Sequence, residues 1–193
     1  MSGINLYDKK GHRKYLSQTE REAFLSAAEK APREVRTFCG VLVYSGCRIS
    51  EALALTTDRV DLSEKVLVFE TVKRRKAGIF RAVPVPPHLL DALELVHSIR
   101  ASAKKHTKKK QKLWDWSRPT AWRRVKEVLD AAGVKGPQAS PKGLRHAFGI
   151  RAVSAGIPLN MVQKWLGHAQ LMTTAIYADA IGVEEKNIAA KMW

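Results

Sequence analysis

The sequence has no run of about eighteen apolar residues, so we expect none of its segments to span a membrane. Its first fifteen residues, MSGINLYDKKGHRKY, contain no apolar stretch like that of a secretion signal. Only two residues are cysteines, Cys39 and Cys47, which are too few for a disulfide framework or a cysteine zinc cluster. These absences indicate a cytoplasmic protein whose cysteines stay reduced.

Acidic residues are scarce. There are 18 Asp and Glu against 34 Lys and Arg, which gives a formal net charge of +16 and an isoelectric point near 10.1. This excess predicts a polyanionic partner, because bound phosphates release their counterions. The alternative is that the charge only keeps the protein soluble, but a net charge as large as this one favours nucleic acid as the binding partner. Residues 104–126 carry ten Lys and Arg against Asp115 alone, interleaved with tryptophans. We expect a folded basic arm or helix there, near a phosphate backbone.

Hydrophobic spacing, caps and turn residues outline the fold. A chain of 193 residues with 45% apolar content can bury the core of one domain. Two strands at 65–72 and 80–85, joined by a turn at 77–78, predict a single β-hairpin. The predicted fold class is therefore mainly α with a small antiparallel β-sheet (α+β). Helices are predicted at 17–32, 35–46, 49–55, from 86 onward, and at 117–133, 140–156 and 158–167.

The stretch KWLGHAQLMTTAIYADA, residues 164–180, places His168 and Tyr177 nine positions apart. On one unbroken helix, nine residues make about two and a half turns, so the two side chains would point in opposite directions. Gly167 can end one helix, and Thr173 or Thr174 can cap the next. The turn between the two helices would let His168 and Tyr177 converge.

Three motifs together carry a resemblance, although each of their polar residues alone has an ordinary structural explanation. YSGCRISEALAL around Arg48 resembles the first arginine box of the tyrosine recombinases, the phage integrase family. KGLRHAFG around Arg145 resembles the second box, and LGHAQLMTTAIYA resembles the segment with the family's histidine and nucleophilic tyrosine. The intervals also match the family, with 23 residues from Arg145 to His168 and nine more to Tyr177.

The resemblance covers about residues 15 to 185 and implies the tyrosine recombinase catalytic-domain fold. It assigns a basic lead-in to residues 1–14, the catalytic domain to 15–182 and a tail to 183–193. The tail either docks on a neighbouring protomer or packs on its own core. The family's N-terminal core-binding domain is absent, so we expect a catalytic domain alone, naturally minimal or a fragment, with weak and salt-dependent DNA affinity.

The chemistry that the resemblance implies needs neither metal nor other cofactor. Tyr177 attacks a DNA phosphodiester, forming a 3′-phosphotyrosyl link and releasing a 5′-hydroxyl that can reverse the step. Arg48 and Arg145 bind the phosphate, since guanidinium groups contact two of its oxygens and stay charged. His168 donates a further hydrogen bond to the same phosphate.

The general acid is expected to be a lysine of the hairpin. Lys73 is favoured from its interval after the first box, and Lys76, eight residues before Pro84, is the alternative. Lys142 stands where the family usually has a histidine, and we expect it to be a phosphate ligand because lysine is a poor base. His146 is expected to orient its helix by hydrogen bonding, and Glu51 to be a buried structural partner in the first box.

The sequence therefore predicts a site-specific recombinase that binds double-stranded DNA. It is expected to be monomeric in free solution, to form a tetramer on DNA with a four-way-junction intermediate, and to associate with the nucleoid. Two alternatives share the fold: a type IB topoisomerase that relaxes supercoils, and a non-catalytic DNA-binding regulator. A third alternative, a basic RNA-binding protein, has no supporting motif in the chain.

Overall fold

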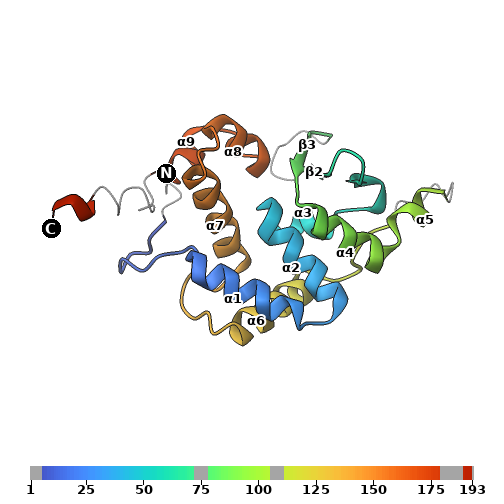
Figure 1. The fold of residues 1–193 in the computed structure, drawn as a ribbon, viewed down its shortest axis with the longest axis horizontal. Coiled ribbons are helices and arrows are strands. Elements are labelled where there is room, and N and C mark those ends of the chain that lie inside the picture. Colours follow the sequence, from blue (N-terminus) through green and yellow to red (C-terminus); the bar gives the residue numbers. More distant parts are fainter. Residues whose placement is uncertain (1–5, 72–77, 105–110, 179–188, 193) are drawn as a thin grey trace.

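A computed structural model describes residues 6–71, 78–104, 111–178 and 189–192 of the chain. In these ranges helices dominate and one small antiparallel sheet is present (Figure 1), which confirms the predicted fold class. The helices are α1 Gln18–Glu29, α2 Arg33–Ser45, α3 Ile49–Leu53, α4 Pro87–His97, α5 Ile99–Lys104, α6 Arg118–Ala131, α7 Pro141–Ser154, α8 Leu159–Leu166 and α9 Met172–Ala175, with 3-10 turns at Thr57–Arg59 and Ala190–Met192. Among the described residues, none of these helices has both the length and the apolar character to cross a bilayer.

The predicted helix ends are set by local capping. Ser17 and Glu20 form a reciprocal capping box at the start of α1, which satisfies two main-chain N–H groups. Gly46 and Gly167 end α2 and α8 with left-handed φ values of 61° and 65°, a conformation that costs glycine little. Each of these two glycines lies within one of the candidate site motifs, directly before Cys47-Arg48 or directly before His168.

The sheet contains β1 Val60–Asp61, β2 Val66–Glu70 and β3 Phe80–Pro84 in the order β1-β2-β3. The predicted hairpin is confirmed: β2 and β3 pair antiparallel, with Phe69 opposite Arg81. Residues 72–77, which include Lys73, Lys76 and the first residue of the predicted turn, lie outside the described residues. Strand β1 was not predicted, because two residues are too few to show an alternating pattern.

Two apolar clusters hold the described part of the chain together. The larger one joins α1, α2, α4, α6 and the sheet, while α2 lies between α7 and α4 (Figure 1). The smaller cluster joins the N-terminal segment to α7 and α8, and its buried members are Leu6, Ala152, Val162, Leu166 and Tyr177. The candidate nucleophile is therefore part of a packed core.

The chain after α8 differs from the sequence prediction. Helix α9 begins at Met172, with Leu171 in the capping position, so neither Thr173 nor Thr174 caps it. The hydroxyl of Thr174 is instead hydrogen-bonded to His168 Nδ1 at 2.9 Å. The predicted break between two helices is nevertheless correct.

The basic segment 104–126 is only partly described, because residues 105–110 lie outside the described ranges. Trp114 is buried, and its Nε1 donates to the carbonyl oxygen of Glu34 at 3.0 Å. Trp122, on α6, is 49% exposed. The first of these tryptophans therefore belongs to the core, while the second lies on a surface helix that also carries arginines.

Candidate active site

Arg145 is the buried centre of the candidate site. Its Nη1 donates to the carbonyl oxygen of Gly46 at 2.7 Å, and its Nη2 to that of Leu166 at 2.6 Å. These carbonyls lie at the C-terminal ends of α2 and α8, where the helix dipoles favour a cation. Burial, and next the charge of Arg48, lower the pKa of Arg145 to about 10, so the side chain stays charged at neutral pH.

Arg48 is the N-cap residue of α3, and Glu51 holds it in two ways. The main-chain N–H of Arg48 donates to Glu51 Oε2, and its Nη1 donates to Oε1, both at 2.8 Å. The carboxylate side chain of Glu51 is fully buried. The interpretation of Glu51 as a buried structural partner is therefore confirmed.

Arg81, on β3, is a member of the site that sequence reasoning missed. Its Nη2 donates to Glu51 Oε2 at 2.7 Å, and its Nε donates to the carbonyl oxygen of Trp165 at 2.7 Å. The side chain is only 4% exposed. The alternation in FRAVPV could have shown that Arg81 is buried, because it places Arg81 on the same face of the strand as the buried Val83.

The two arginines also set the charge of Glu51. Burial by itself raises the pKa of the Glu51 carboxyl, but the charge and hydrogen bonds of Arg81, followed by those of Arg48, outweigh it and lower the pKa overall. Glu51 is thus ionised and shared between two guanidinium groups. This sharing leaves part of the positive charge of Arg48 uncompensated, which suits an anionic ligand.

His168 follows the Gly167 cap and is 7% exposed. Its pKa is lowered to about 3, mainly by burial and then by Arg145 and Arg48, so the ring is neutral at neutral pH. Its Nδ1 lies 2.9 Å from Thr174 Oγ1. When that hydroxyl donates to Nδ1, the ring carries its proton on Nε2, the tautomer that can donate to a phosphate oxygen.

Tyr177 lies in the turn after α9 and is 2% exposed. Its ring stacks on that of His168, with centroids 6.3 Å apart and an interplanar angle of 19°, so the predicted convergence of these two residues is confirmed. Burial raises the pKa of the Tyr177 hydroxyl, while Arg145 and then Arg48 act in the opposite direction. Four of the predicted site residues are therefore within electrostatic reach of one another.

His146 is hydrogen-bonded as expected, and its partner lies outside its own helix. Its Nδ1 lies 3.1 Å from the hydroxyl oxygen of Tyr177, which links α7 to the turn after α9. Burial, followed by the charges of Lys142, Arg145 and Lys14, lowers the pKa of His146 to about 4. Lys142 is exposed on the first turn of α7, and Lys14 brings the N-terminal segment close to the site.

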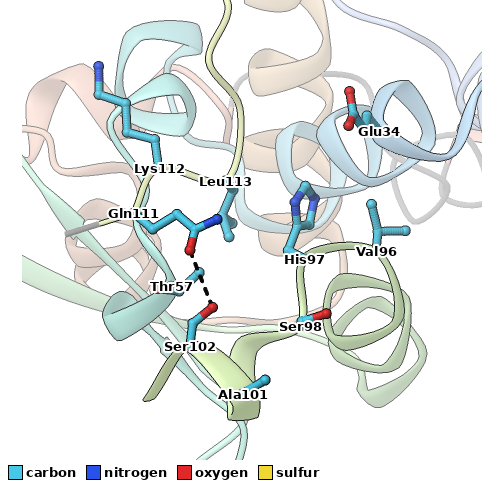
Figure 2. A pocket seen from close by; sticks show the side chains of 10 residues that line it. All are labelled: Glu34, Thr57, Val96, His97, Ser98, Ala101, Ser102, Gln111, Lys112 and Leu113. Carbon is cyan, nitrogen blue, oxygen red and sulfur yellow. Dashed lines mark hydrogen bonds between the residues drawn. The ribbon is translucent and has the colours of Figure 1, made fainter. Parts of the chain in front are cut away.

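Outside these residues, two features bear on ligand binding, the grouping of metal-ligating side chains and a cavity. Among the described residues, no three His, Cys, Asp or Glu side chains are grouped so that they could hold a metal ion. A cavity of about 370 Å³ lies between the ends of α4 and α5 and the segment 111–113 (Figure 2). His97, Gln111 and Lys112 are among its lining residues, and the lining includes none of the arginines, histidines or tyrosine of the candidate site.

Known proteins share both the sequence pattern and the fold. The model of the phage integrase family matches residues 14–181, and the chain belongs to this family. Tyrosine recombinase XerA from Pyrococcus furiosus is 31% identical over 170 residues, which cover 85% of this chain and 56% of that protein. The chain thus spans a little over half the length of this relative.

Two solved structures have the same fold. XerH site-specific recombinase in its post-cleavage complex with palindromic difH substrate superimposes with a TM-score of 0.77 at 22% identity, covering 100% of this chain and 57% of that one. The catalytic domain of bacteriophage HP1 integrase superimposes with a TM-score of 0.62 at 22% identity, covering 92% of this chain and 93% of that one.

Proposed function

We propose that the chain is the catalytic domain of a site-specific DNA recombinase that cuts and rejoins strands through a 3′-phosphotyrosyl link to Tyr177. The observation that carries the proposal is the grouping of this tyrosine with His168 and the charged Arg145 in a protein of net charge +16. Family membership and the DNA complex of XerH support double-stranded DNA as the partner.

In this reaction the scissile phosphate binds against Arg48 and Arg145. Phosphoryl transfer depends mainly on positioning and on stabilising the charge of the crowded transition state, and fixed guanidinium groups do both. Arg145 is held by two main-chain carbonyls, so it needs little reorganisation when the phosphate arrives. His168 donates from Nε2 to another phosphate oxygen.

The remaining groups handle protons and charge. Lys73 protonates the departing 5′-oxygen, with Lys76 as the alternative, and single-turnover cleavage by Lys73→Ala and Lys76→Ala variants distinguishes the two. Lys142 is exposed one turn before Arg145 and serves as a phosphate ligand. The protein is a monomer in free solution, and full recombination uses four protomers bound to DNA. Binding to chromosomal DNA would place the protein on the nucleoid.

The test is covalent capture. The protein is incubated with a library of nicked duplexes of randomised sequence, so that cleavage releases a short fragment and traps the adduct. We expect wild type and Tyr44→Phe to form an adduct, and Tyr177→Phe to form none. Binding without any adduct would support the regulator, and relaxation of a plasmid that lacks every captured sequence would support the topoisomerase.

A further inference from the structure

The hydrogen bond between Tyr177 and His146 lies at the oxygen atom that attacks the phosphate in the proposed reaction. A tyrosine hydroxyl titrates near pH 10, so a group in the site must accept its proton during attack. The group nearest to that proton is His146, with Nδ1 at 3.1 Å from Tyr177 Oη. Both side chains are 2% exposed, which leaves little room for water to take this role.

Lys142, which stands where the family usually has a histidine, is poorly suited to accept the proton of the Tyr177 hydroxyl. Lys142 is exposed and, as an ammonium group, has no lone pair to accept a proton. Its charge instead acts on His146, which lies one helical turn further along α7, and favours the neutral imidazole there. A neutral imidazole is the form that accepts a hydrogen bond and then a proton.

The other nitrogen of His146 gives a second, independent sign. Nε2 is buried and has no hydrogen-bond partner among the described residues. Because buried polar atoms in native proteins are almost always paired, this atom needs an explanation. When Nδ1 accepts from Tyr177, Nε2 carries the proton of the neutral ring, and a phosphate oxygen or water entering with DNA would be its acceptor. The imidazole of His146 would therefore be stabilised as a cation when a DNA phosphate is bound beside it.

We infer that His146 is the general base of strand cleavage. As Tyr177 Oη forms its bond to phosphorus, its O–H bond breaks and the proton passes to Nδ1 of His146. The P–O bond to the 5′-oxygen breaks at the same time, and that oxygen takes its proton from the hairpin lysine. In rejoining, the 5′-hydroxyl oxygen attacks phosphorus and gives its proton back to the hairpin lysine, while the P–O bond to Tyr177 breaks and the proton on His146 returns to the departing Tyr177 oxygen. This inference rests on the proposed function.

The experiment measures single-turnover cleavage of a captured nicked duplex by wild type, His146→Asn and His146→Ala. Asparagine keeps an acceptor oxygen near the position of Nδ1 but cannot take a proton. We expect both variants to cleave about 100-fold or more slowly, the usual size of a general-base contribution. His97→Asn is the matched control, because His97 is also hydrogen-bonded to a hydroxyl, that of Thr37, but lies outside the site.

A fluorinated tyrosine at position 177 separates proton transfer from positioning. Fluorotyrosine loses its proton more readily, so the penalty of His146→Asn should shrink at least tenfold when it replaces tyrosine. An equal penalty with both phenols would mean that His146 only positions Tyr177 and would overturn the inference.

Two other outcomes are also decisive. Cleavage by His146→Ala or His146→Asn at or above the wild-type rate would show that the bond only holds Tyr177 back in the free protein. Thermal unfolding establishes whether each variant is folded. If His146→Ala is not folded, the conclusion is drawn from His146→Asn. Failure of wild type to form any Tyr177 adduct would instead refute the proposed function.

Discussion

Replacing Arg81 by methionine should destabilise the protein strongly. The change leaves the Glu51 carboxylate, which is fully buried, without two of its hydrogen bonds, at 2.7 and 3.4 Å. Breaking a buried ion pair on one side typically costs about 3–5 kcal/mol. Arg48 still holds Glu51, so we expect the lower end, about 3 kcal/mol. For a domain of this size, that loss lowers the melting temperature by about 6–12 °C.

Urea unfolding followed by circular dichroism measures this loss. Arg100→Met is the matched control, because Arg100 is 71% exposed and lies 3.9 Å from its partner Glu94. Exposed pairs of this kind contribute about 0–1 kcal/mol. The double variant Arg81→Met with Glu51→Gln should be more stable than Arg81→Met alone, because it removes the uncompensated buried charge.

Acid titration gives a second measurement of the same pair. The pKa of Glu51 is below its ordinary value, so this group adds stability above that value and loses it as the pH falls through the folded-state pKa. In Arg81→Met, burial dominates and acid destabilisation should begin at a higher pH. If Arg81→Met unfolds within 1 kcal/mol of Arg100→Met, the account of this network is wrong.

Three further predictions concern the site and its partner. Burial holds the pKa of His146 at about 4 and that of His168 at about 3, so the unfolded chain binds more protons below pH 6.5. Stability should then fall by about 2–3 kcal/mol between pH 7.5 and 5.5, and replacing both histidines by asparagine should flatten this profile in urea titrations. A Cβ at Gly149 would lie 2.5 Å from the Tyr177 ring, whereas one at Gly40 meets only a leucine methyl at 2.8 Å. Gly149→Ala should therefore lose about 1–3 kcal/mol and most cleavage activity, and Gly40→Ala little of either; equal behaviour would refute the close packing. Affinity for duplex DNA, measured by fluorescence anisotropy, should fall about 1,000-fold or more between 50 and 200 mM salt if six or more phosphates are neutralised, and a flat profile would contradict the charge argument.

Local signals account for most of what the sequence could predict. Ser17, Gly46 and Gly167 each act on the chain within one helical turn, so the helix ends they mark were predictable from the local sequence. The hairpin followed from alternation and a turn. The convergence of His168 and Tyr177 followed from a break between two short helices.

The contacts that could not be predicted join residues far apart in the chain. Glu51 and Arg81 are 30 positions apart, and His146 and Tyr177 are 31 apart. Spacing within one element does not determine such pairs, since they depend on how α7, the sheet and the turn after α9 pack together. Thr174 was misplaced as a cap because a threonine near a helix start can bond either the main chain or, as here, a side chain.

The anchoring of Arg145 has a consequence for how the fold can diverge. Its two partners, at positions 46 and 166, are carbonyl oxygens of the main chain, which every amino acid carries. No particular side chain has to be kept at Leu166 for this contact to survive, only the path of the backbone at the end of α8. An arginine held in this way tolerates sequence change around it, provided that the main chain keeps its path at positions 46 and 166.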